Sequence, residues 1–376
     1  MDTSQPLALL GGLTPALFMK RHWQKKPLLV RNAVPGMTPL VQRDALFQLA
    51  SRDDVESRLV MQDADAWRMR RGPFTRRALP ALSRPAWTLL VQGVDLHDGS
   101  AHALLQQFGF IPRARMDDLM VSYASEGGGV GPHFDSYDVF LLQVQGQRRW
   151  RYGRQRDLSL RDDVPLKILA SFEPEHDEVL EPGDMLYLPP RYAHDGVAVG
   201  ECQTYSIGFR SPSLSELARE VLSRLAEDAG DAVGDALYAD PKQEASGTPG
   251  AVPAALTEFA AKAVRDALQD PRSLDRALGE YLTEPKQDVW FDAGSLPRKL
   301  GALVLDARTR MLYDAVHVFV NGESWRAAGR DAKLMQVLAD RRRLDAAQVQ
   351  GASADAQSLL ASWCKAGWAH LERTQR

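Results

Sequence analysis

Two short segments of this chain supply two histidines and a carboxylate at a spacing that suits one metal ion. The first reads Gly-Pro-His-Phe-Asp at residues 131–135, and the second ends in Pro-Pro-Arg-Tyr-Ala-His at residues 189–194. In an extended strand, residues i and i+2 point to the same side, so His133 and Asp135 can reach one ion. His194 lies 59 residues beyond Asp135. A second strand must therefore fold back beside the first.

Two histidines and one carboxylate that leave coordination positions open are the ligand set of a non-haem iron(II) site. A His-x-Asp pair alone is weak evidence, but its flanks strengthen it. Glycines crowd residues 127–131, where the backbone can turn tightly, and two prolines just before the second histidine end a strand. We therefore predict that His133, Asp135 and His194 bind iron(II) and form the catalytic centre. The other histidines are interpreted as structural or exposed: His22, His97, His102, His176, His317 and His370.

The composition is that of an ordinary globular protein. Of the 376 residues, 44% are hydrophobic and 25% are charged, and the net charge is −3. This length favours two or three domains, and the mixed charge does not favour nucleic acid as a partner. Two cysteines alone fit a reducing compartment. Because the chain start lacks a signal-peptide pattern and no segment reaches the roughly 18 apolar residues of a membrane span, we expect a cytoplasmic protein.

Residues 1–210 are dense in short strand-like runs separated by Gly, Pro and Asp, a pattern typical of a β-sandwich or barrel. Early helices are expected at about 13–23 and 43–51. The predicted strands are 27–30, 87–91, 119–123, 139–144, 184–188 and 204–209.

The pattern becomes helical after Arg210. Ser213 and Glu216 have the spacing of a capping box, and apolar residues then recur at helical spacing as far as Leu225. Residues 240–253, rich in Pro, Gly, Ala and Ser, predict a loop. Further helices are predicted at 254–269 and 273–282. These helices either pack against a partner chain or cap the first domain, and their pattern alone favours neither.

The last segment mixes short strands and helices, as a winged-helix module does. Strands are predicted at 303–305 and 316–320, with Asn321-Gly322 as a hairpin turn. Helices are predicted at 332–342 and 354–366. The run Arg341–Arg343 could contact nucleic acid, but a solvated helix end is the more common role of such a run.

An iron oxygenase of this type needs a co-substrate that delivers electrons. 2-Oxoglutarate chelates iron through its keto group and one carboxylate, and its distal carboxylate then needs a cation, preferably a bidentate one. Arg148 and Arg149 follow the first two ligands on the same predicted strand. They alternate in direction, so only one points inward, and Trp150 shares the side of Arg148. Alternation alone does not identify the inward side.

These motifs resemble the cupin-type JmjC oxygenases, and more narrowly the bacterial ribosomal oxygenases of the protein arginine hydroxylase type. The resemblance implies an α+β architecture. It comprises a double-stranded β-helix JmjC domain (1–211), a helical dimerisation region (212–290) and a winged-helix-like C-terminal domain (291–376), with the chain a homodimer. The motifs that carry it are at residues 133–140, 146–151 and 181–187, with further matches at 22–27, 72–74, 117–120 and 205–210.

The resemblance also implies an activity, namely iron(II)- and 2-oxoglutarate-dependent hydroxylation, with O2, of an arginine in large-subunit ribosomal protein number sixteen. It assigns Arg148 to the distal carboxylate of 2-oxoglutarate, and Ser122 and Ser206 to the co-substrate pocket, with Thr204 nearby. The alternatives are histidine hydroxylation of another ribosomal protein and a non-catalytic metal cupin that binds ribosomes.

The substrate arginine is expected between Met120 and Tyr137, with its charge paired to Asp118. Asp118, Met120 and Ser122 share one side of their predicted strand, and Tyr137 shares the parity of the first two metal ligands. Without the resemblance, ordinary core packing would be the preferred interpretation of Met120 and Tyr137.

Overall fold

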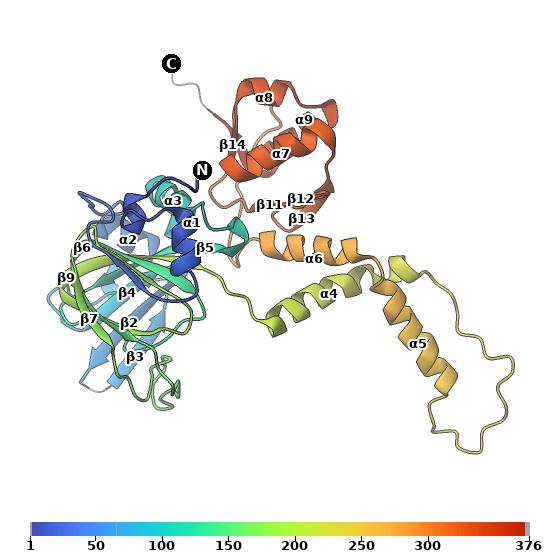
Figure 1. The fold of residues 1–376 in the computed structure, drawn as a ribbon, viewed down its shortest axis with the longest axis horizontal. Helices are drawn as coiled ribbons and strands as arrows, with labels where there is room; N and C mark the ends of the chain where they lie inside the picture. Colours follow the sequence, from blue (N-terminus) through green and yellow to red (C-terminus); the bar gives the residue numbers. More distant parts are fainter. Residues whose placement is uncertain (1, 65, 373–376) are drawn as a thin grey trace. The chain divides into compact units, whose positions relative to one another are not determined.

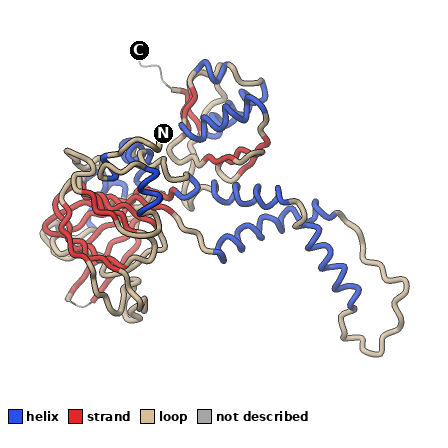
Figure 2. Tube along the Cα trace, viewed as in Figure 1, coloured by secondary structure: helices blue, strands red, loops and turns tan. Residues whose placement is uncertain are grey.

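The computed structural model describes residues 2–64 and 66–372, which fall into two compact units divided after Ser211 (Figure 1). The first unit is a curled antiparallel sheet with helices beside it, and this is the predicted cupin architecture (Figure 2). Its helices are α1 (Pro15–Arg21), α2 (Arg43–Leu49) and α3 (Gly99–Gln106), with short 3-10 turns at Ala8–Leu10, Arg76–Ala78, Val94–Leu96 and Arg113–Arg115.

Nine strands form the sheet, in the order β1-β8-β6-β9-β5-β4-β2-β3, with β7 paired to β6. All six predicted strands are present, and β2, β3 and β7 are additional. Two of the additional strands are largely exposed, and β3 is rich in arginine, so neither has the apolar pattern that identifies a strand in a sequence. The bounds are β1 Leu28–Val30, β2 Ser57–Asp63, β3 Ala66–Arg71, β4 Trp87–Val91, β5 Met116–Ala124, β6 Asp138–Gly153, β7 His176–Leu180, β8 Met185–Leu188 and β9 Ala193–Phe209.

Strand β6 contains a bulge that decides which of its side chains face inward. Its register against β9 shifts twice between Gln143 and Gln147. Gly146 lies in this stretch with φ +60°, and a Cβ there would be 2.1 Å from the carbonyl oxygen of Glu201. Because an L side chain fits neither the backbone angle nor the space, glycine is required here. Gln143 pairs with Thr204, but Gln147 pairs with Val199, so the two shifts leave a net offset of one residue. A net offset of one residue exchanges the two faces of the strand.

The bulge explains why simple alternation could not orient the two adjacent arginines. Before it, Val139 and Leu141 line an internal cavity, and after it Arg148 and Trp150 line the same cavity. Odd-numbered residues thus face this cavity on one side of the bulge and even-numbered residues on the other. Arg149 points outward and forms a surface ion pair.

A buried carboxylate ties the start of β6 to the rest of the domain. Asp138 is fully buried, and its two oxygens accept hydrogen bonds from the Tyr187 hydroxyl at 2.6 Å, the Arg115 guanidinium at 2.9 Å and the Gln24 amide at 3.0 Å. Burial, followed by the charge of Asp138, raises the pKa of the Tyr187 phenol, so this hydroxyl remains a donor. The hydrogen bonds of Asp138 fix the start of β6, which follows the first two predicted metal ligands by three residues.

Replacing Arg115 with methionine should lower the free energy of unfolding by about 3 kcal/mol, because it leaves a buried carboxylate without its cationic partner. Urea denaturation measures the change. The matched control is Arg149→Met, which removes an exposed ion pair and should cost less than about 1 kcal/mol. Equal losses in the two variants would show that the Asp138 group is not an important source of stability.

The second unit begins with three helices: α4 (Leu214–Val233), α5 (Ala254–Ala267) and α6 (Pro271–Thr283). Both hydrogen bonds of the predicted capping box, between Ser213 and Glu216, are present. Helix α4 continues past Leu225, the last residue of the apolar pattern, and the predicted loop at 240–253 precedes α5. Within residues 2–64 and 66–372, no helix is both long and apolar enough to cross a bilayer.

The remainder of the second unit is a small α+β fold with its own core, as the sequence predicts. Two three-stranded sheets have the orders β14-β10-β15 and β11-β12-β13. Asn321 and Gly322 form the predicted two-residue turn, both with positive φ. Helix α6 packs on β11, β12 and β13. The elements are β10 Leu303–Leu305, β11 Met311–Tyr313, β12 His317–Val320, β13 Glu323–Arg326, α7 Gly329–Arg341, β14 Arg343–Leu344, α8 Ala346–Gln350, α9 Ala354–Ala366 and β15 Ala369–Leu371.

The arginine run at the end of α7 has structural partners. Arg342 ends the helix with φ +58°, and its guanidinium donates to the carbonyl oxygens of Thr309 and Asp306. Arg343 pairs with Glu372. Two of the three arginines therefore close this small domain, which agrees with the interpretation of the run as a helix end.

Candidate active site

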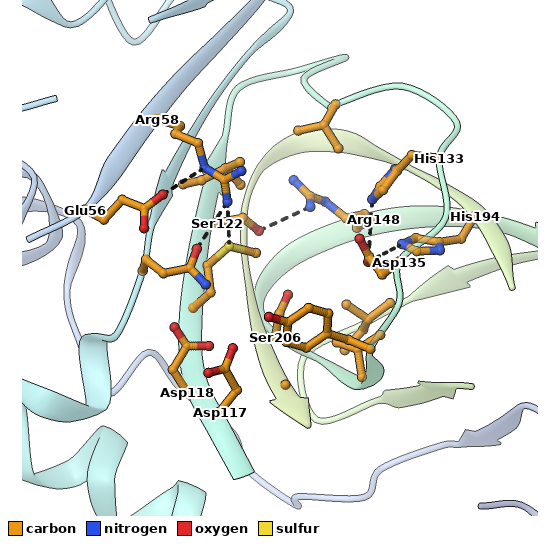
Figure 3. A pocket seen from close by; sticks show the side chains of 18 of the residues that line it. Glu56, Arg58, Asp117, Asp118, Ser122, His133, Asp135, Arg148, His194 and Ser206 are labelled. Atoms are coloured by element: carbon orange, nitrogen blue, oxygen red, sulfur yellow. Dashed lines mark hydrogen bonds and ion pairs between the residues drawn. The ribbon is translucent and has the colours of Figure 1, made fainter. Parts of the chain in front are cut away.

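Three side chains converge at one end of the first unit's cavity (Figure 3). The Nε2 atoms of His133 and His194 lie 3.8 and 3.6 Å from Oδ2 of Asp135. One ligand atom from each of the three residues lies within 4.8 Å of the other two. This separation leaves room for one ion in contact with all three atoms. The predicted ligands are thus brought together, although they come from two distant segments.

The two imidazoles are oriented by the backbone. Nδ1 of His133 lies 2.9 Å from the carbonyl oxygen of Gly131, and Nδ1 of His194 lies 2.9 Å from that of Tyr192. A carbonyl oxygen can only accept, so each Nδ1 carries the proton and each Nε2 presents its lone pair. Burial, together with the neighbouring His133, lowers the pKa of His194 to about 4. His194 is therefore neutral, as a metal ligand must be.

His194 is the second residue of β9, as expected of a ligand from another strand, whereas His133 and Asp135 lie in the loop that precedes β6. His133 and His194 pair as an isolated antiparallel bridge, with backbone hydrogen bonds of 2.9 and 2.8 Å. The backbone N–H of Arg191 donates to the carbonyl oxygen of Asp135 at 2.7 Å. The expectation that His133 and Asp135 lie in a strand is wrong, because both precede β6. The bridge extends the chain locally and preserves the predicted i, i+2 relation.

The ligands open into a cavity of about 370 Å³ that contains nearly all the predicted site residues. The predicted residues that line it are His133, Asp135, His194, Arg148, Ser122, Ser206, Asp118, Met120 and Tyr137. Thr204 is not among the lining residues. It is fully buried, and its hydroxyl donates to Oε1 of Gln143 at 2.8 Å, so its role is in the packing of the sheet.

Arg148 is a buried cation in this cavity, and its guanidinium is only partly hydrogen-bonded. It is 5% exposed, its Nη1 donates to the Ser122 hydroxyl at 3.2 Å, and its guanidinium lies 5.7 Å from the Trp150 ring centre. Its Nε and Nη2 are buried and have no hydrogen-bond partner among the described residues. Unsatisfied buried donors on a cation cost several kcal/mol unless an anion completes them. The cavity therefore suits a small molecule with a carboxylate, bound between Arg148 and the three predicted metal-binding side chains.

The opposite end of the cavity is acidic and apolar. Asp118 is buried, and its Oδ2 accepts from the backbone N–H of Gly93 at 2.9 Å. Tyr137 and Asp117 are neighbours of Asp118, since a Cβ built at Gly208 would lie within 4 Å of all three side chains, and Met120 also lines the cavity. Two adjacent carboxylates beside an aromatic ring and a thioether form an environment suited to a cationic side chain.

One wall of the cavity comes from residues that the sequence prediction missed. Arg58 on β2 donates to Oε1 of Gln92 at 3.1 Å, lies 4.0 Å from the sulfur of Met120, and is 3.9 Å from Glu56. These residues line the cavity with Asp117. Strand β2 itself was not predicted, and no motif marks Arg58, so only its pairing with β4 reveals it. Of these missed residues, only Asp117 could have been suspected from the sequence, because it is adjacent to the predicted site residue Asp118.

The fold and the ligand set define a JmjC-domain protein. The JmjC domain family matches residues 103–217, and the ROXA-like winged helix family matches residues 266–370. The chain belongs to the JmjC-domain ribosomal oxygenases, on the basis of these matches and of full-length structural likeness at 30% identity.

Individual relatives are also ribosomal hydroxylases or oxygenases by name. Ribosomal protein uL16 3-hydroxylase of Escherichia coli K12 is 39% identical over 231 residues, which are 60% of this chain and 59% of that protein. The probable ribosomal oxygenase of Haemophilus influenzae is 41% identical over 209 residues, or 54% of this chain and 52% of that one. The matched sequence thus spans little more than half the length of these curated relatives.

Solved structures extend the likeness to almost the whole chain. The X-ray structure of E. coli ycfD has a TM-score of 0.84 and 30% identity, covering 96% of this chain and 98% of that one. A structure of YcfD, a ribosomal oxygenase from E. coli, in complex with cobalt and 2-oxoglutarate has a TM-score of 0.80 and 30% identity, covering 96% and 99%.

Proposed function

We propose that this chain is an iron(II)- and 2-oxoglutarate-dependent oxygenase that hydroxylates an arginine side chain of a large-subunit ribosomal protein of the uL16 class. The observation that carries the oxygenase part is the buried, incompletely bonded Arg148 in one cavity with three convergent metal ligands. The complex of YcfD with cobalt and 2-oxoglutarate supports the same pair of ligands. The name of the uL16 3-hydroxylase supports a ribosomal substrate.

In this proposal, His133, Asp135 and His194 hold iron(II), which with 2-oxoglutarate and O2 supplies the oxidising chemistry for an unactivated carbon. Arg148 pairs with the distal carboxylate of 2-oxoglutarate, and Ser122 is already hydrogen-bonded to that guanidinium. Ser206 lines the same pocket. The neutral imidazoles and fixed loops position the ligands before the substrate binds, so that little reorganisation is required.

An arginine substrate is supported by the acidic end of the cavity. A guanidinium between Tyr137 and Met120 would contact a π face and a polarizable sulfur while approaching Asp118. A neutral histidine side chain gains less from carboxylates, which disfavours the histidine hydroxylase alternative. Consumption of 2-oxoglutarate by the iron-loaded protein, measured with and without uL16, separates an oxygenase from a non-catalytic metal cupin. No stimulation by any ribosomal protein would favour the cupin.

Replacing Asp118 with asparagine should weaken binding of an arginine-containing uL16 peptide by about tenfold, since one charge-assisted contact contributes roughly 1.5–3 kcal/mol and the amide retains a carbonyl acceptor. Affinity is measured with metal and 2-oxoglutarate present, and metal affinity is measured separately. Asp163→Asn, a change on the exposed surface, is the control. Equal peptide affinity in the Asp118 variant and the wild type would contradict recognition of a cation at Asp118.

We also propose that the helices of residues 212–290 form a homodimer contact. A groove of about 330 Å³ between α4 and α5 is lined by apolar side chains. Several of them are well exposed, including Leu222 at 54% and Val264 at 61%. Light scattering at micromolar concentration should give twice the chain mass, and Val264→Glu should shift the population toward monomer. A monomeric wild type would refute this contact. The organisation into 1–211, 212–290 and 291–376 remains part of the same proposal.

A further inference from the structure

A second cavity in the first unit contains an accumulation of positive charge. Its volume is about 310 Å³, and it shares no lining residue with the metal cavity. Four of its lining residues are cationic and none is acidic, in a chain whose net charge is −3. The lining residues are Gln24, Lys25, Arg154, Gln155, Arg156, Leu158, Pro189, Pro190, Arg191 and Tyr192.

Two of the cations are held in place by neutral groups. The Lys25 ammonium donates to the carbonyl oxygen of Lys20 at 2.8 Å, at the end of α1. The Arg154 guanidinium donates to the carbonyl oxygen of Lys25 at 2.9 Å and lies 5.7 Å from the ring centre of Tyr192. These contacts fix the side chains but do not neutralise them, because carbonyl groups and a phenol ring carry no net charge.

The other two cations, Arg156 and Arg191, have no carboxylate within 4.0 Å among residues 2–64 and 66–372. Elsewhere in the same unit, Arg149 pairs with Asp177 at 2.5 Å and Arg161 pairs with Asp163 at 2.6 Å. The cavity is distinguished by four cations that line one small space, and not by the absence of carboxylate partners alone. The adjacent Asp157 is occupied locally, since it accepts from the backbone and hydroxyl of Ser159.

We propose that this cavity binds a phosphate group. Several guanidinium groups around a small cavity offer pairs of N–H donors that match the non-bridging oxygens of a phosphate, which number three in a monoester and two in the diester of an RNA backbone. The phosphate could come from an RNA backbone or from a free phosphate monoester, and the two sources share this chemistry. The neutral amides of Gln24 and Gln155 would add further donors.

The cavity adjoins the loop that positions the metal ligands. Residues 189–192 line it, and in the same loop the Arg191 backbone N–H donates to Asp135 while the Tyr192 carbonyl accepts from His194. A phosphate bound there would therefore lie on the same unit as the proposed hydroxylation site. This inference goes beyond the proposed function, and it is tested without turnover.

The test uses the full chain without metal or 2-oxoglutarate, and measures fluorescence anisotropy of a labelled, short single-stranded RNA over a range of salt concentrations. The variant is Arg156→Ala with Arg191→Gly, in which glycine accommodates the φ of +63° at position 191. The matched control removes two paired arginines from the same unit, as Arg149→Ala with Arg161→Ala. Inorganic phosphate and a poly-glutamate peptide serve as competitors.

We expect the wild type to bind RNA and the variant to bind it more weakly, with the slope of log K against log salt reduced by about 1.4 for two lost phosphate contacts. The control should bind as the wild type does. RNA binding that is weaker in the variant than in the control supports the RNA source, and phosphate binding by titration calorimetry without RNA binding supports the monoester. Equal losses in variant and control, stronger competition by poly-glutamate, or no binding of either phosphate ligand would overturn the proposal.

Discussion

Replacing Asp135 with alanine should abolish metal-dependent consumption of 2-oxoglutarate while leaving the fold intact. Asp135 is the only charged ligand of the three, and its Oδ2 lies within 3.8 Å of both imidazole Nε2 atoms. Removing a group that merely orients a ligand typically costs about 10–100-fold in metal affinity, and loss of a direct ligand should exceed that. The fold should persist, because the backbone contact from Arg191 to this residue does not involve the side chain.

Titration with cobalt(II), followed by its visible absorption, measures metal affinity directly. Asp163→Ala is the matched control, since it also removes one exposed carboxylate from the same unit. Circular dichroism checks that both variants are folded. Wild-type metal affinity in the Asp135 variant would contradict the assignment of this residue as a ligand.

Replacing Arg148 with methionine should have opposite effects on the free protein and on its complex with 2-oxoglutarate. In the complex, the distal carboxylate loses its cation, and the dissociation constant should rise by about 100-fold, equivalent to roughly 3 kcal/mol. In the free protein, an incompletely bonded buried cation is replaced by an apolar chain of similar length. This change should stabilise the fold by about 1 kcal/mol or more.

Thermal melts with and without 2-oxoglutarate separate the two effects. The melting temperature of the free variant should be above that of the wild type, and added 2-oxoglutarate should raise it far less. Arg149→Met, on the outer side of the same strand, should leave the response to 2-oxoglutarate unchanged. An unchanged response in the Arg148 variant would mean that another cation holds the carboxylate.

The prediction from sequence was most successful where local chemistry is strong. The two histidines and the carboxylate have motif context on both sides, and the capping box at Ser213 and the turn at Asn321-Gly322 are local patterns that the structure confirms. The resemblance to the ribosomal oxygenases is also confirmed, by the full-length likeness to YcfD.

The prediction from sequence was weakest where segments that are distant in the chain come together. The direction of Arg148 depends on the bulge around Gly146, which is imposed by the neighbouring strand and the carbonyl group of Glu201. Arg58 joins the cavity only because β2 pairs with β4, and β2 lacks a recognisable motif. Thr204 shares its strand with Ser206, yet its hydroxyl is directed to Gln143, which no spacing rule predicts. Tertiary pairing decides all three.

The most direct test of the central claim combines the purified chain with iron(II), 2-oxoglutarate, O2 and uL16, followed by fragmentation mass spectrometry of the uL16 peptides. The proposal predicts a gain of one oxygen on an arginine, dependent on 2-oxoglutarate and absent with the Asp135→Ala variant. Oxygen on a histidine instead would contradict the substrate assignment. No incorporation by a protein that binds both metal and 2-oxoglutarate would contradict the proposed reaction on uL16.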